Sequence, residues 1–520
     1  MRLSIGIVLA IAMTTGMLST TVASQSQASR PSPAPITEGR LTDPAPDLPR
    51  GANLPPNWLA DDQFLRWPYP PGDVAYTDLD GFRIKAFINE ITAISRKSRD
   101  DGNQYWGRIA GTAYERMTNE WTAAQFRRIG LEQVRIQEAD LPPQWFPTSW
   151  ELTASGAGKT VPIGTAFPLF NSVATNGTLN LEPIWLGMGT AADFADRNVS
   201  GKVVVLYGFP NPGGRGNTAL TLGAVRRADE AGAAAVLLIL GFPGNVLNQP
   251  QAGGTNAPAK VPVFMVGDQD GRTIRGMIER KESPTLRLRL AVETRTGLKT
   301  ANVWGVLPGA TDENIAVMAH ADAFFEGAMD NASGMATMVA LAEHYAKLPK
   351  AQRRRTMTFF TTAAHHSPSG ENAGVRWVHN NMQQMFSKTA LLINAEHTAQ
   401  VATYLVGEAF ITSNMVSARR WYVGGSSHLQ DIVLKTFKEY GIALYSRPEG
   451  RPGGELGEVF TDAPSFHIID HTVYHTDLDT LSAVPAYGLE QSARAFAKII
   501  DQVNGVDIRD LRGGPVTTTR

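Results

Sequence analysis

Hydrophobic and polar positions along the chain follow two periods, and these divide the sequence into helices and strands. The apolar run from 315 to 319 is short and continuous, which is typical of a strand buried on both faces. From about Asn331 to 348 apolar residues instead recur with the spacing of one helix face: Met335, Met338, Val339, Ala342 and Tyr345. The sequence therefore predicts a strand, a loop and a helix in this stretch.

The same criteria predict helices and strands in alternation along most of the chain. The strand at 285–292 shows the clearest alternation, with leucines facing inward and arginines outward. The remaining predicted helices lie at 81–97, 113–129, 219–231, 270–280 and 488–503, and the remaining strands at 133–138, 181–186, 202–207, 233–240, 261–266, 356–362 and 390–395. This order predicts an α/β fold in which a mostly parallel mixed sheet is flanked by helices. A β-rich α/β module is inserted before the C-terminal half.

The N-terminal region has the pattern of an exported protein. Arg2 precedes an apolar core from Leu3 to Leu18, and small residues at 21–23 or 26–28 offer a cleavage site. This core is shorter than the roughly 20 residues of a membrane span. We therefore expect a secreted or periplasmic protein with no membrane attachment after signal cleavage.

Composition shifts divide the 520 residues into six segments. We expect a signal peptide (1–28), a Pro-rich N-terminal arm (29–75), an N-terminal part of the main domain (76–159), the inserted module (160–295), the remainder of the main domain (296–508) and a tail (509–520).

Charge and cysteine content exclude several classes of function. The formal net charge is −1 and the pI is about 6.8, which argues against a nucleic-acid or anionic-membrane surface. Because the chain has no cysteine, it is neither a disulfide scaffold nor a thiolate metal protein.

Side chains that can bind a metal follow the predicted strands of the C-terminal half. His320 and Asp322 lie at the end of the first strand, and Asp330 lies where the N-cap of the next helix is expected. Later strand ends carry further candidates: His365, His366, Glu396, His397, His467, His471 and His475. All ten histidines occur at or after His320. Since the ends of parallel strands meet at one edge of a sheet, these residues predict a metal site there.

The order of these residues resembles that of the dizinc aminopeptidases of metallopeptidase family 28. The residues that carry the resemblance are His-Ala-Asp at 320–322, Asp-Asn-Ala-Ser-Gly at 330–334, Asn-Ala-Glu at 394–396 and Tyr-His-Thr at 474–476. The inserted module resembles the protease-associated domain, on the segments Gly-Lys-Val-Val-Val at 201–205 and Gly-Ala-Ala-Ala-Val at 232–236. The resemblance implies a zinc exopeptidase-like fold, two Zn²⁺ ions per chain and peptide or protein N-termini as substrate.

The resemblance also implies a role for each matching residue. His320 and Glu396 would bind the first zinc, although Glu396 stands where the family usually has Asp. Asp330 would bridge both ions, and His475 would bind the second. Asp322 would orient His320.

One pair departs from the family pattern, and it leaves two registers open. The family has two consecutive glutamates here, a general base and a ligand of the second zinc, where an ungapped count gives His365 and His366. In this register His365 is the base and His366 the ligand. In a second register, Gly-Glu-Asn-Ala-Gly at 370–374 supplies Glu371 as the base and leaves Asn372 in the zinc position.

Two functions from different classes follow. The first is a zinc-dependent exopeptidase, an aminopeptidase that hydrolyses N-terminal peptide bonds with a metal-activated water. The second is a catalytically silent homologue that binds peptides or serves as a scaffold. The missing glutamates favour the silent homologue, whereas the retained metal-binding side chains favour the enzyme.

Overall fold

The structure, a computed structural model, describes residues 70, 72–209, 218–242, 244–250, 257–406, 409–445, 463–470 and 472–512. The expected signal peptide and most of the Pro-rich arm lie outside these residues, as do His471 and most of the tail. Among the described helices, none combines the length and the apolar character needed to cross a membrane.

A seven-stranded mixed sheet forms the centre of the main domain, in the order β19-β20-β16-β13-β15-β12-β2. Its four central strands, β20, β16, β13 and β15, run parallel, and the strands at both edges are antiparallel. The strands are β2 (Glu132–Asp140), β12 (Lys299–Leu307), β13 (Thr311–His320), β15 (Arg355–Thr362), β16 (Thr389–Asn394), β19 (Arg420–Gly424) and β20 (Ser465–Ile469). The mixed sheet flanked by helices confirms the predicted fold class.

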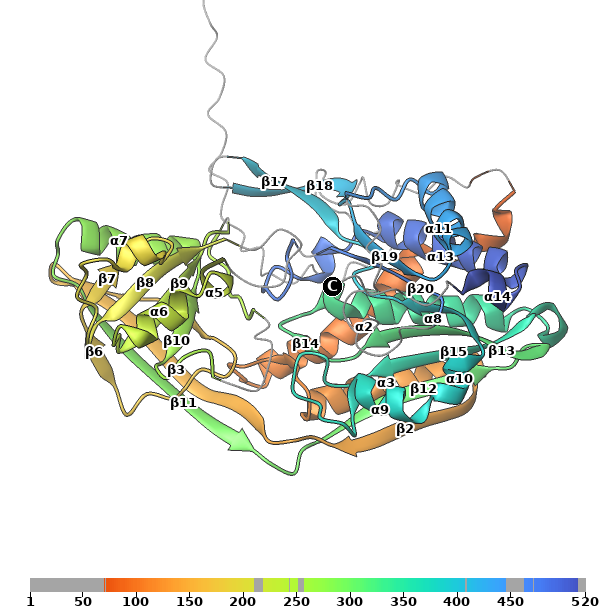
Figure 1. The fold of residues 1–520 in the computed structure, drawn as a ribbon, viewed down its shortest axis with the longest axis horizontal. Helices are drawn as coiled ribbons and strands as arrows, with labels where there is room; N and C mark the ends of the chain where they lie inside the picture. Colours follow the sequence, from red (N-terminus) through yellow and green to blue (C-terminus); the bar gives the residue numbers. More distant parts are fainter. Residues whose placement is uncertain are drawn as a thin grey trace, which may run out of the picture. The chain divides into compact units, whose positions relative to one another are not determined.

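Helices cover both faces of this sheet (Figure 1). One face packs against α2 (Gly81–Asp100), α3 (Ala113–Ile129), α8 (Gly334–Ala346), α11 (Ser427–Glu439) and α13 (Ala486–Asn504). The other face packs against α9 (Gly374–Asn381) and α10 (Gln383–Ser387).

Alternate residues of one central strand enter the two cores. Val317 of β13 packs toward the five helices, while its neighbour Met318 packs toward α9 and α10. Burial on both faces explains why these strands are continuous apolar runs in the sequence.

The inserted module contains two further sheets. One has the order β5-β10-β9-β8-β7 and the other the order β4-β3-β11-β6. The strands are β3 (Gln144–Gly156), β4 (Lys159–Pro162), β5 (Phe167–Pro168), β6 (Leu179–Leu181), β7 (Pro183–Trp185), β8 (Val203–Gly208), β9 (Ala235–Leu240), β10 (Val263–Val266) and β11 (Thr285–Arg295), and the helices are α4 (Ala191–Phe194), α5 (Thr218–Thr221), α6 (Ala224–Glu230) and α7 (Asp268–Glu279).

Two predicted elements of the module are broken in the structure. The expected helix at 219–231 is split into α5 and α6 at Gly223, whose positive φ of 72° ends the first turn. The expected strand at 181–186 is split into β6 and β7, which belong to different sheets. Pro183 begins β7, a position that proline tolerates because it lacks an N–H group.

Long paired strands connect the module to the main sheet. β2 pairs with β12, and β3 pairs with β11, so the chain leaves and returns along an antiparallel ribbon. Asp140 lies opposite Lys299, and Gln144 lies opposite Arg295. Neither β3 nor β12 was predicted from the sequence.

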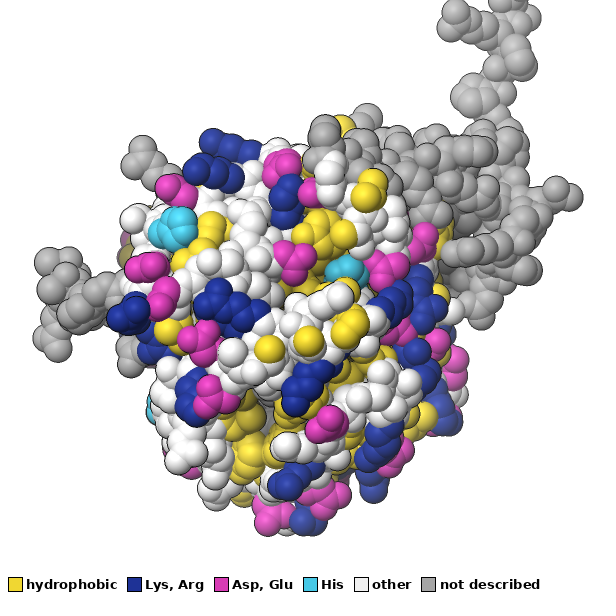
Figure 2. Space-filling view, turned by 90° about the vertical axis from the view of Figure 1, so that its right-hand side faces the viewer, with side chains coloured by type: hydrophobic (Ala, Val, Ile, Leu, Met, Phe, Trp, Pro, Cys, Tyr) yellow, Lys and Arg dark blue, Asp and Glu magenta, His cyan; other side chains and the backbone are white. Residues whose placement is uncertain are grey.

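Short elements complete the described chain: β1 (Gly107–Arg108), β14 (Ala323–Phe324), β17 (Val401–Val406), β18 (Ala409–Val416), α14 (Ile508–Leu511), η1 (Val74–Tyr76), η2 (Ala328–Ser333), η3 (Lys350–Gln352) and η4 (Leu481–Ala483). On the face shown in Figure 2, basic and acidic side chains are interspersed over the described residues.

Candidate metal centre

The candidate side chains lie where the parallel strands of the main sheet end. β13 ends at His320, β15 is followed by His365 and His366, and β16 is followed by Glu396. Because these strands run parallel and are adjacent, their C-terminal ends place the side chains at one edge.

Asp330 lies at the centre of this group and does not cap the following helix. It adopts non-helical angles (φ −110°, ψ 90°) in η2, and α8 begins four residues later, at Gly334. The prediction of Asp330 as the N-cap is therefore wrong. The carboxylate of Asp479 accepts hydrogen bonds from the main-chain N–H groups of Met329 (2.6 Å) and Asp330 (3.0 Å) within η2. The Asp330 carboxylate is thereby left to face the imidazoles.

Four histidines approach the two oxygens of Asp330 through Nε2. Oδ1 lies 3.0 Å from His320 and 3.2 Å from His397. Oδ2 lies 3.1 Å from His475 and 3.4 Å from His366. All five side chains are buried.

Glu396 adds a second carboxylate beside Oδ1 of Asp330. Its Oε1 lies 3.8 Å from His320 Nε2. Its Oε2 accepts a hydrogen bond from Asn394 Nδ2 (2.9 Å) and lies 2.9 Å from His467 Nε2. Oε1 of Glu396 thus faces the imidazole of His320, and Oε2 is held by Asn394 and His467.

The chemistry of these atoms fits a pair of metal ions. Both oxygens of Asp330 and the Nε2 atoms of His320, His366 and His475 are buried without a hydrogen-bond partner of good geometry. A buried polar atom without a hydrogen-bond partner lowers the stability of the fold, and a bound cation provides the missing partner. Among the described residues, three groups of metal-capable side chains have suitable spacing. Two of them share Asp330, namely His320, Asp330 and Glu396, and Asp330, His366 and His475; the third is His320, His365 and His366. Imidazole and carboxylate donors are the ligands zinc takes in a protein without cysteine.

The opposite nitrogens of these imidazoles are held by the protein. Nδ1 of His320 bonds to the main-chain carbonyl of Asp322 (3.1 Å), and Nδ1 of His475 bonds to that of Gln249 (2.8 Å). Ligand histidines usually donate this second N–H group, which fixes the ring and its tautomer. Gln249 belongs to the inserted module, so the module orients a side chain of this centre.

The Asp322 side chain serves the histidine pair rather than His320. Its oxygens accept hydrogen bonds from the main-chain N–H groups of His365 and His366, both at 2.9 Å, and one lies 3.2 Å from His366 Nδ1. The nearest approach to His320 Nδ1 is 3.8 Å. His320 is oriented instead by the carbonyl of the same residue.

Electrostatics divide the imidazoles into two kinds. Burial, together with the neighbouring His366, lowers the pKa of His475 to about 4. Burial also disfavours a charged His366, but Asp330 and Asp322 outweigh it and raise the pKa of His366 to about 10. At neutral pH His475 is therefore uncharged and presents a lone pair to Asp330.

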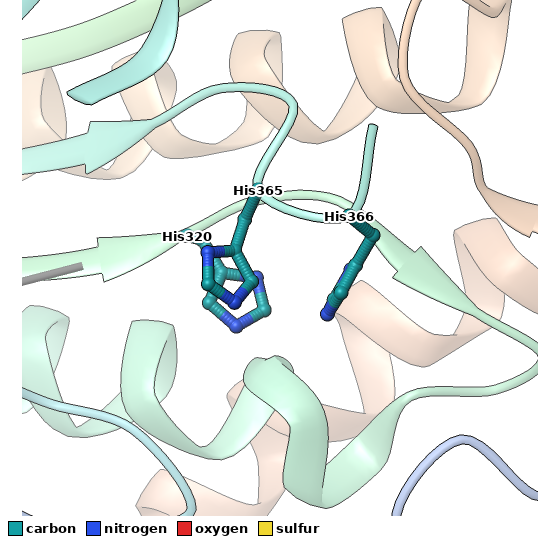
Figure 3. A group of neighbouring side chains, drawn as sticks. All are labelled: His320, His365 and His366. Atoms are coloured by element: carbon teal, nitrogen blue, oxygen red, sulfur yellow. The ribbon is translucent and has the colours of Figure 1, made fainter. Parts of the chain in front are cut away.

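The structure brings the His365–His366 pair into the centre and leaves Glu371 outside it. The ring of His365 stacks on that of His320, with centroids 4.4 Å apart and planes at 24°, while the His366 ring is perpendicular to His320 (Figure 3). His365 is partly exposed. Glu371 and Asn372 are both exposed on the following loop, outside the clusters of metal-capable side chains found among the described residues.

Three residues of this centre received no role in the sequence analysis. His397 and His467 stood among the strand-end candidates but matched no family position, and Gln249 lies in a segment without histidine. The position of His397 directly after Glu396 was the available signal. No pattern in the sequence pointed to a main-chain carbonyl.

Two family models match the chain. Residues 302–500 match the model described as peptidase family M28, and residues 170–274 match the PA domain. A search of curated proteins finds no match.

Solved structures share the fold across most of the chain. A peptidase M28 precursor from Shewanella amazonensis SB2B is 18% identical with a TM-score of 0.64, over 85% of this chain and 98% of that one. A zinc aminopeptidase from Bacillus subtilis is 17% identical with a TM-score of 0.57, over 84% and 98%. An aminopeptidase from Aneurinibacillus sp. strain AM-1 is 20% identical with a TM-score of 0.54, over 86% and 98%.

Proposed function

We propose that this chain, which belongs to peptidase family M28 through residues 302–500 and carries a PA domain, is an exported zinc-dependent aminopeptidase. One observation carries the proposal: four imidazoles approach the two oxygens of the buried Asp330 carboxylate, with Glu396 beside one of those oxygens. Two structural neighbours are aminopeptidases, which supports the choice of reaction.

Two zinc ions per chain would be held by the two donor sets that share Asp330. His320 and Glu396 complete the first set, and His366 and His475 complete the second. Zinc ions bound there would polarise the carbonyl of a peptide bond and make water a nucleophile at neutral pH.

The residues around the donors supply proton transfer and orientation. His365 is the partly exposed imidazole beside the donors, and imidazole accepts protons near neutral pH, so we assign it as the general base. Asp322 fixes the backbone of the pair through its two hydrogen bonds, which sets the position of His365. The expected substrate is the N-terminal residue of a peptide or protein.

The metal requirement is the first test. After zinc reconstitution and dialysis, elemental analysis should find about two ions per wild-type chain. Asp330→Asn should lose most of both ions, because the bridging carboxylate serves both donor sets. Asp312→Asn, at an exposed residue paired with Lys388, is the matched control and should keep both. A wild-type chain that binds no zinc would rule out the enzyme.

The base is tested by comparing two variants on an aminoacyl amide substrate. His365→Ala should lower kcat by roughly 10²–10⁴, the scale for losing a positioned base, while the zinc content stays at the wild-type level. Glu371→Gln should leave kcat nearly unchanged, because Glu371 is exposed on its loop.

The opposite pattern would mean that Glu371 is the base in solution. A chain that binds two zinc ions and hydrolyses none of a panel of aminoacyl amides and dipeptides would instead support the catalytically silent homologue.

A further inference from the structure

His397 is positioned in the same way as two of the histidines in the donor sets. Its Nδ1 contacts the main-chain carbonyl of Asp470, and its Nε2 faces Asp330 Oδ1. His320 and His475 have the same arrangement, with Nδ1 on a main-chain carbonyl and Nε2 on Asp330. His397 is fully buried, and like His475 it has a positive φ, a backbone angle that residues other than glycine rarely adopt.

The tautomer of His397 follows from its carbonyl contact. A carbonyl oxygen only accepts hydrogen bonds, so Nδ1 must carry the proton. Nε2 is then the nitrogen that faces the Asp330 oxygen, at 3.2 Å. A cation bound by that oxygen would also lie within reach of Nε2.

The donor distances fit a common ion. Tetrahedral donors at about 2.0–2.1 Å from zinc lie roughly 3.3–3.4 Å from one another. His397 Nε2 lies 3.2 Å from Asp330 Oδ1 and 3.7 Å from Glu396 Oε1. The corresponding distances of His320 Nε2 are 3.0 and 3.8 Å. Both imidazoles therefore approach the same two oxygens at nearly the same distances.

We propose that His397 is a fourth protein ligand of the first metal site. This inference rests on the proposed zinc centre. The first site then has four protein donors, two imidazoles and two carboxylates, as in a closed site. The second site has three, from Asp330, His366 and His475, which leaves one position of a tetrahedral ion without a protein ligand. The two ions would thus be unequal, with the first held by more protein donors.

The number of bound imidazoles tests the proposal in the wild-type protein itself. With two equivalents of Co²⁺, each ligating imidazole that keeps a protonated Nδ1 gives one exchangeable, strongly shifted proton resonance in the NMR spectrum. We expect four such resonances, from His320, His366, His397 and His475. Three resonances would overturn the proposal.

Metal affinity provides a second measurement. Losing an outer hydrogen-bonding partner of a ligand lowers metal affinity by about 10–100-fold. Losing a direct ligand should cost more, so His397→Gln should weaken binding of the tighter Co²⁺ ion by more than about 100-fold. The same variant should lose one of the four resonances. His344→Gln is the control and should keep both ions, because His344 is a buried histidine of α8 whose hydrogen-bonding partner is Asp78.

The outcomes separate this inference from the proposed function. If His397→Gln keeps all four resonances and loses less than 100-fold in affinity, His397 is not a ligand, while the zinc enzyme stands. If the wild-type chain binds no cobalt or zinc, the enzyme itself fails. If His397→Gln does not fold, the resonance count of the wild-type protein decides.

Discussion

At the scale of single residues, a second buried carboxylate contrasts with Asp330. Glu115 on α3 accepts hydrogen bonds from the main-chain N–H of Gly111 (2.7 Å) and from the hydroxyl of Thr300 (2.5 Å). Burial, with the nearby charge of Asp322, raises the pKa of Glu115 to about 8. The folded chain therefore holds a proton that the unfolded chain releases near pH 4.5.

This proton makes the stability of the chain depend on pH. Between about pH 4.5 and pH 8 the folded state keeps the proton and the unfolded state does not, so the free energy of unfolding falls as pH rises. The fall is roughly 1.4 kcal/mol for each pH unit in this window, and it ends above the folded pKa.

Glu115→Gln should remove this slope, because glutamine fills the same space without a charge. Relative to the variant, the wild-type protein should lose stability from pH 5 to pH 8 and remain at a constant difference above pH 8. Urea unfolding at several pH values measures the difference. Parallel profiles of the two proteins would mean that Glu115 is already ionised throughout the range.

The sequence predicted most residues of the candidate centre but not the contacts that hold them. Residue type and spacing along the chain were enough to select His320, Asp330, His366, Glu396 and His475. The place of His397 depends on a positive φ and on the Asp470 carbonyl, which residue types do not encode.

At the scale of elements, one loop of the module contacts the candidate metal centre. The main-chain N–H of Gln249 donates to the His475 carbonyl at 2.9 Å, and the Gln249 carbonyl accepts from His475 Nδ1 at 2.8 Å. Asn248 Nδ2 also donates to the His475 carbonyl, at 3.1 Å. The carboxylate of Asp477 accepts the N–H of Leu247 at 3.0 Å. This loop therefore fixes both the backbone and the ring of His475.

Asn248→Ala should loosen His475 without removing a donor. We expect the affinity for the second ion to fall by about 10–100-fold, the usual effect of losing an outer partner, while the first ion stays bound. Titration with a competing chelator measures both ions.

Asn245→Ala is the matched control, because Asn245 lies in the same loop and bonds to Asp270 within the module. Equal effects of the two variants would mean that the loop acts through general destabilisation rather than through His475.

Elements with a strong period were predictable, whereas elements defined by long-range pairing were not. α3 begins and ends where the sequence placed it, and α13 differs by only two residues at its start and one at its end. β3 and β12 were missed because their partners, β11 and β2, lie far away in the sequence, and pairing rather than local pattern defines them.

At the scale of the whole molecule, the module and the main domain share a hydrophobic core. Phe324 and Phe325, which follow β13, pack in one cluster with Phe167, Val203 and Leu237 of the module. The sequence suggested a separate small module because its pattern changes abruptly near 160. The shared core could not be read from the sequence, since each of these residues also suits an internal core of either part.

The antiparallel ribbon has a consequence for how such a chain could arise. The inserted segment begins and ends at paired positions, Gln144 opposite Arg295, so its two ends are already held as close as the strands of a hairpin. Loop-closure entropy rises by only about 0.6 kcal/mol per doubling of loop length. An ancestral sheet could therefore accept or exchange a whole cassette at this hairpin at little entropic cost. Any replacement would still have to supply a carbonyl for His475. The length of the inserted segment could therefore vary during evolution, whereas the loop that contacts His475 could not.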